Sequence, residues 1–152
     1  MLRVLIASFH LLALGLGLYA VLTRGTVLRA EVSSDSLRRA FRADNLWAAA
    51  AFLWLATGLW RVFGALEKPT AYYLNNDIFL IKMMLFVLMF VLEVWPMRTL
   101  MRWRAALRRG EDPAVFASRA AATRVATISH AEALVVVLMI FAATAMARGY
   151  GA

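Results

Sequence analysis

The sequence predicts an all-α integral membrane protein, a four-helix up-down bundle with both termini on the outer (periplasmic) side of the membrane. Composition is the first observation, because 63% of the 152 residues are hydrophobic and only 17% are charged, against roughly 25% in soluble domains. The second is the length of the apolar runs, since a helix needs about 20 apolar residues to cross a bilayer. Such runs occur at about 4–23, 45–63, 78–97 and 128–147.

Four spans leave only loops, so residues 1–152 are predicted to form a single transmembrane domain with no separate soluble domain. Short loops between successive spans favour antiparallel neighbours and therefore an up-down order. The chain has no cysteine. This absence excludes disulfides, thiolate zinc sites, iron–sulfur clusters and thiol nucleophiles.

The first two spans are predicted as follows. The run at 4–23 is interpreted as a retained helix, because it lacks a small-x-small cleavage site and is long for a signal peptide. The loop 24–44 is expected to contain a short interfacial helix that Ser34 or Asp35 caps. The span at 45–63 has tryptophans near its ends, as interfacial positions favour.

The second half of the chain continues the same pattern. A short turn around Lys68-Pro69 disfavours helix and leads into the span at 78–97. The loop 98–127 begins as a basic segment on the inner surface. The span at 128–147 then closes the bundle near the C-terminal residues.

The distribution of arginine and lysine predicts the orientation, because positively charged loops stay in the cytoplasm. The predicted outer side has four basic residues: Arg3, Arg61, Lys68 and Arg148. The predicted inner loops contain twelve: Arg24, Arg29, Arg38, Arg39, Arg42, Arg98, Arg102, Arg104, Arg108, Arg109, Arg119 and Arg124. The net charge of +8 is therefore explained by the membrane rather than by nucleic acid, and anionic lipids are expected at the basic loops.

Ionisable side chains inside spans are costly and are candidate functional residues. His10 shares its helix face with small residues, Ala13 and Gly17 among them, so this face is expected to pack against protein. Depth along the helices groups His10 with Arg61 and Lys82 in the outer half of the bundle. These three are the candidate cofactor-binding residues, and His10 is a metal ligand only if haem is bound.

A second polar group is expected nearer the cytoplasm. It contains Asp44, Glu93, His130 and Glu132. His10 and His130 are separated by roughly 17 Å along the membrane normal, at about 1.5 Å of rise per residue. They are therefore a poor axial pair for a haem, and a haem at His10 would have a different or vacant second ligand.

Five stretches resemble the bacterial domain-of-unknown-function 2214 family of small membrane proteins. They are "FHLLAL", "LRRAFRADNLW", "LATGLWRVF", "EKPTAYYLNNDIFLIKMMLF" and "AMARGYG", and the likeness covers nearly the whole chain. The resemblance implies a four-span inner-membrane protein and brings no established activity. The positions it marks are His10, Arg42, Asp44, Gly58, Arg61, Lys68, Tyr73, Asn75, Lys82, Glu132 and Arg148.

A weaker architectural likeness is to haem-binding membrane protoporphyrinogen oxidases. Those proteins also have a histidine early in the first helix and a lysine early in a later helix, as His10 and Lys82 are here. This chain has Glu93 about where such an oxidase has a further histidine on the lysine-bearing helix.

Three functions follow from these residues. The protein binds a redox cofactor (haem b, a porphyrin or a quinone) near His10, or it is a non-enzymatic accessory subunit of a larger membrane complex or a homo-oligomer. The third alternative is a transporter or a proton relay that works through His10, Lys82 and Glu93. Soluble-enzyme signatures are absent from the sequence, including the phosphate loop, the dinucleotide fingerprint and HExxH.

Overall fold

The computed structural model describes residues 1–64 and 68–151, and this part of the chain is helical, with no strand. Four helices are long and apolar enough to cross a membrane. This confirms the all-α fold and the number of candidate spans, whereas the side of the membrane on which the termini lie stays a prediction. The helices are α1 (Leu2–Ala30), α2 (Ser34–Phe63), α3 (Thr70–Leu74), α4 (Asp77–Arg108), α5 (Pro113–Phe116) and α6 (Arg119–Ala147).

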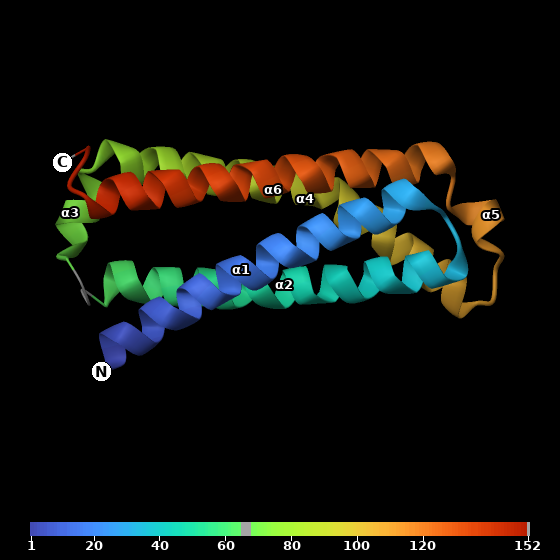
Figure 1. Cartoon of the computed structure of the whole chain (residues 1–152), viewed down its shortest axis with the longest axis horizontal. Helices are drawn as coiled ribbons and strands as arrows, with labels where there is room; N and C mark the ends of the chain where they lie inside the picture. The colour runs from blue at the N-terminus through green and yellow to red at the C-terminus, as the bar shows by residue number, and fades with distance from the viewer. Residues whose placement is uncertain (65–67, 152) are drawn as a thin grey trace.

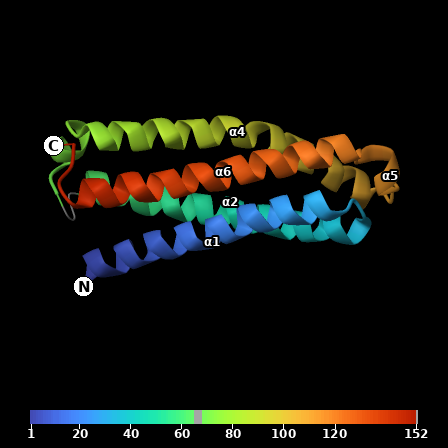
Figure 2. The same ribbon diagram turned by 45° about the horizontal axis from the view of Figure 1, so that its top comes forward.

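The four long helices form two pairs. Helix α1 packs along α2 and α4 packs along α6, and contacts between α1 and α6 join the pairs. Both termini and α3 lie at one end of the molecule, the terminal end, whereas α5 lies at the other, the loop end (Figure 1). The pairs approach each other at the loop end, and α1 diverges from α6 toward the terminal end (Figure 2).

The helices continue into the predicted loops 24–44 and 98–127, whereas the positions at which the spans enter and leave the membrane stay a prediction. Most of residues 24–44 are helical, because α1 runs to Ala30 and α2 begins at Ser34. The expected short interfacial helix is therefore the first part of α2. Its cap is Ser33, one residue before the predicted Ser34, and Ser33 and Ser36 form a reciprocal capping box, which satisfies backbone donors at the helix start.

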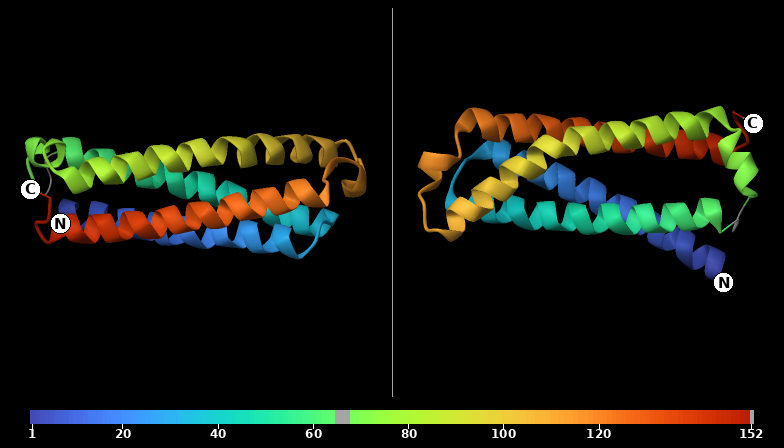
Figure 3. Two further views of the ribbon diagram at one scale, coloured as in Figure 1. Left: turned by 90° about the horizontal axis from the view of Figure 1, so that it is seen from above. Right: turned by 180° about the vertical axis from the view of Figure 1, so that it is seen from behind.

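Helix α4 changes its packing partner along its length. Pro96 lies within it, and a proline inside a helix removes one backbone hydrogen bond and introduces a kink. Toward its basic end α4 leaves α6 and crosses toward α2 (Figure 3). Arg104 there donates hydrogen bonds to Asn45 (2.8 Å) and Asp44 (3.2 Å) on α2.

The face of α1 that carries small residues allows α1 and α2 to pack closely. A Cβ atom on Gly17 would lie 3.0 Å from the Trp47 ring and 3.5 Å from Ala50. The indole of Trp47 therefore covers the glycine directly. This face also includes Ala13 and Ala20, which are buried, so the predicted protein-facing side of α1 is confirmed by the packing.

Candidate functional site

His10 is buried between α1 and α2, with both ring nitrogens engaged. Its side chain is only 7% exposed. The Trp54 indole N–H donates to Nε2 at 2.8 Å, and Nδ1 lies 2.9 Å from the Thr57 hydroxyl. A Cβ on Gly58 would approach the His10 ring to 3.2 Å, so the glycine at 58 leaves room for the imidazole.

These contacts define which nitrogen of His10 carries the proton. An indole N–H is only a donor, so Nε2 accepts and Nδ1–H points to the Thr57 hydroxyl, which itself donates to the Leu53 carbonyl at 2.7 Å. The ring is thus a neutral imidazole held by two partners. It does not fit a haem iron ligand in this arrangement, because the Nε2 lone pair is occupied by Trp54.

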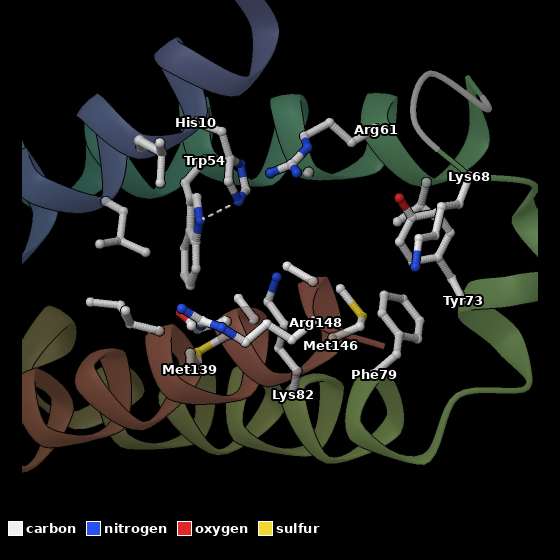
Figure 4. Close-up of a pocket in the computed structure, with 18 of the residues that line it drawn as sticks. His10, Trp54, Arg61, Lys68, Tyr73, Phe79, Lys82, Met139, Met146 and Arg148 are labelled. Atoms are coloured by element: carbon white, nitrogen blue, oxygen red, sulfur yellow. Dashed lines mark hydrogen bonds between the residues drawn. The ribbon is translucent and has the colours of Figure 1, made fainter. Parts of the chain in front are cut away.

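A cavity of about 590 Å³ opens beside His10 at the terminal end. Arg61 from α2 and Lys82 from α4 face each other across it, next to His10 (Figure 4). The structure therefore brings the three predicted residues to one cavity. Its volume is within the range of about 300–1,000 Å³ typical of ligand sites. Apolar lining comes from residues including Leu14, Met139, Ile140 and Ala143.

Positive charge dominates the cavity. Arg61, Lys68, Lys82 and Arg148 line it, and no acidic side chain does so among the residues that the structure describes. The Lys68 ammonium lies 3.7 Å from the centroid of the Tyr72 ring. Lys82 is half-buried, and no hydrogen bond or ion pair joins its ammonium to the described residues.

A second polar site lies further toward the loop end and centres on Arg24. All five N–H groups of its fully buried guanidinium have an acceptor. Nε donates to the Ser129 hydroxyl at 2.9 Å, and Nη1 donates to Asp44 (2.8 Å) and Glu93 (2.9 Å). Nη2 donates to Glu93 at 2.8 Å and to Glu132 at 2.6 Å. We call Arg24, Asp44, Glu93, Arg104, Ser129 and Glu132 the Arg24 cluster; it joins the four long helices.

The second predicted group is therefore partly assembled as expected. Asp44, Glu93 and Glu132 meet at Arg24, and Glu93 also accepts the Trp47 indole N–H at 3.1 Å. His130 is not part of this cluster, because its Nδ1 lies 2.6 Å from the Ala126 carbonyl of its own helix. Its ring packs against Gly25, where a Cβ would lie only 2.8 Å away.

Arg24 and Ser129 were not expected in a site. Arg24 directly follows an apolar run, and the sequence therefore predicts it in a basic loop, where it counts toward the predicted orientation. Without Arg24, eleven of the twelve arginines that predict the orientation are still counted on the inner side. A signal was present in the sequence, because residues 10, 13, 17 and 24 follow one face of a helix of 3.6 residues per turn.

Three positions of the family pattern remain, and of these only Tyr73 lines the cavity. Asn75 ends α3 and donates to the Ala71 carbonyl at 3.0 Å. Arg42 is exposed on α2, and Tyr73 is buried at the cavity. Residues 65–67, part of the predicted turn before Lys68, lie outside the described residues. Within residues 1–64 and 68–151, no three or more His, Asp or Glu side chains are grouped so that they could hold a metal ion.

The fold and the buried polar sites define a class, that of small polytopic membrane proteins built from four apolar helices. The chain belongs to one family of this class, predicted membrane proteins of unknown function (DUF2214), whose sequence pattern matches residues 2–151. No curated protein and no solved structure is detectably similar to this chain.

Proposed function

We propose that this protein binds an amphipathic anion in the cavity beside His10, with the head of the ligand between Lys82 and Arg61. The observation that carries this proposal is a cavity with four cationic side chains and no described acidic side chain. A partly buried cation is stabilised most by a charge-assisted hydrogen bond to an anion. The Lys82 ammonium is available for such a bond.

The apolar lining supports the amphipathic part of the proposal. Leu14 from α1 and Met139, Ile140 and Ala143 from α6 line the same cavity as the cations. Pockets with mostly apolar walls and a few placed polar groups are typical sites for small molecules and cofactors. A ligand with a flat or elongated hydrocarbon body and one or two acidic groups matches this distribution.

Among the predicted cofactors, a porphyrin fits best through its carboxylates. A quinone carries no negative charge for the cations to neutralise, and a haem would have to displace the Trp54 hydrogen bond before its iron reached His10. The proposed role of His10 is therefore to complete the cavity wall as a neutral ring. The proposed location is the bacterial inner membrane, with the cavity in its outer half, as the basic loops predict.

The experiment is an absorbance titration of protoporphyrin IX with the purified protein in nanodiscs of zwitterionic lipid. Saturable binding is expected, and Lys82→Gln should weaken it. A hydrogen bond to a charged group contributes about 1.5–3 kcal/mol, which corresponds to a roughly 10- to 150-fold rise in Kd. Arg98→Gln, a change of an exposed arginine on α4, is the matched control and should leave Kd unchanged.

A second ligand separates charge from hydrophobicity. The dimethyl ester of protoporphyrin IX has the same ring without carboxylates, so its Kd should be much higher and insensitive to Lys82→Gln. Equal affinity for the acid and the ester would refute the anion site. Competition by an anionic lipid added to the nanodiscs would support the site and identify a lipid head as its occupant.

A further inference from the structure

The Arg24 cluster contains more carboxylates than guanidinium groups. Arg24 and Arg104 face Asp44, Glu93 and Glu132, so the cluster carries a net charge of −1 when every carboxylate is ionised. Arg24 and Glu132 are completely buried, and Asp44 and Glu93 are mostly buried. A net charge in such surroundings is costly because water is not there to solvate it.

Glu132 is the carboxylate whose hydrogen bonding is incomplete. One oxygen accepts from Arg24 at 2.6 Å, whereas Oε1 is buried and has no hydrogen-bond partner among the described residues. Glu93 and Asp44 differ, because both oxygens of each accept hydrogen bonds. The unsatisfied atom and the surplus negative charge thus belong to one region of the cluster.

The Glu93 carboxylate is the partner with which Glu132 shares a donor. The two carboxyl groups are held side by side, because one oxygen of each accepts a hydrogen bond from the same Arg24 nitrogen, Nη2. Two ionised carboxylates in this position have only lone pairs to offer each other. A proton on one of them turns it into a donor, and it removes the surplus charge at the same time.

We propose that Glu132 and Glu93 share a bound proton and that the Arg24 cluster is a proton-binding site inside the four-helix bundle. The charged and polar groups that face this pair come from each long helix. Arg24 is on α1, Asp44 and Trp47 are on α2, Arg104 is on α4 with Glu93, and Ser129 is on α6 with Glu132. This site is separate from the cavity at His10 and does not depend on the ligand proposed there.

The test is infrared spectroscopy of the whole protein in nanodiscs at neutral pH. A carbonyl-stretch band of a protonated carboxylic acid is expected, and it should shift to lower frequency in D2O. Glu132→Gln should remove this band. Asp35→Asn, a change of an exposed carboxylate that is 85% accessible, is the matched control and should leave the band in place.

A second variant and a stability measurement guard against misfolding. Glu93→Gln should also remove the band, because the cluster is then neutral without a proton. Glutamine has the shape of a protonated glutamate, so Glu132→Gln is expected to retain the wild-type melting temperature. Absence of the band from the wild type, or a band that survives both glutamine variants, overturns the proposal. A melting temperature that rises with sodium but not with choline, with no band, also overturns it in favour of a bound metal cation.

Discussion

Replacing Arg24 by glutamine should destabilise the bundle more than any other single arginine change at the loop end. The side chain is fully buried, and its five hydrogen bonds reach Ser129, Asp44, Glu93 and Glu132. Removal of one partner from a buried ion pair costs about 3–5 kcal/mol, because the other partner is left uncompensated. Membrane double-mutant cycles average about 0.6 kcal/mol per hydrogen bond, so five bonds alone account for about 3 kcal/mol.

The assay is thermal unfolding of the purified protein in one mild detergent, followed by circular dichroism. For a chain of this size 1 kcal/mol corresponds to about 2–4 °C, so Arg24→Gln should lower Tm by about 6–20 °C. Arg24→Lys keeps the charge but has one nitrogen in place of the planar fork. Its Tm should therefore lie between the Tm of the wild type and that of Arg24→Gln. The control Arg98→Gln removes an exposed arginine and should change stability by less than about 0.5 kcal/mol.

A Tm for Arg24→Gln within about 2 °C of the Arg98→Gln value, roughly the shift that 1 kcal/mol causes, would refute the reasoning. It would mean that desolvation of the guanidinium offsets its hydrogen bonds, so that the cluster positions the helices without stabilising them. Such an outcome would be independent of the proposed proton, which infrared spectroscopy detects directly.

Two further pairs of variants test the α1–α6 contact by the same Tm measurement. Gly25→Ala should lower Tm, because its Cβ would meet the His130 ring at 2.8 Å. Gly15→Ala has open space around the new Cβ and should raise stability by about 0.5–1 kcal/mol. Equal effects of the two variants would contradict the close packing at Gly25. Ser129→Ala leaves Arg24 Nε without its acceptor and should cost about 1–3 kcal/mol, against almost nothing for Thr127→Ala, whose exposed hydroxyl bonds only its own helix.

Hydropathy was sufficient to predict the four helices, because each span must satisfy its backbone hydrogen bonds internally and present apolar side chains to lipid. The ends of the helices were less predictable. Apolar content falls before a helix ends, and α1 continues through Arg24 to Ala30 because that arginine is neutralised by later parts of the chain.

The two polar sites differ in how far the sequence specifies them. Face and depth predicted that His10, Arg61 and Lys82 lie together, and the structure places them around one cavity. The same reasoning grouped Asp44, Glu93 and Glu132 but not their common partner. An arginine beside a loop is normally solvated, and only the acceptors on three other helices, far away in sequence, make its burial favourable.

The position of Arg24 also has a consequence for biosynthesis. The first helix is made and inserted before α4 and α6 exist, so the guanidinium at that time has only Asp44 among its eventual ionic partners. A charge inside a span is costly until it is paired. We therefore expect the newly inserted first helix to sit with Arg24 at the headgroup level and to reach its final depth only when the last helix arrives. Completion of the chain, rather than insertion of α1, then determines when the bundle assumes its final packing.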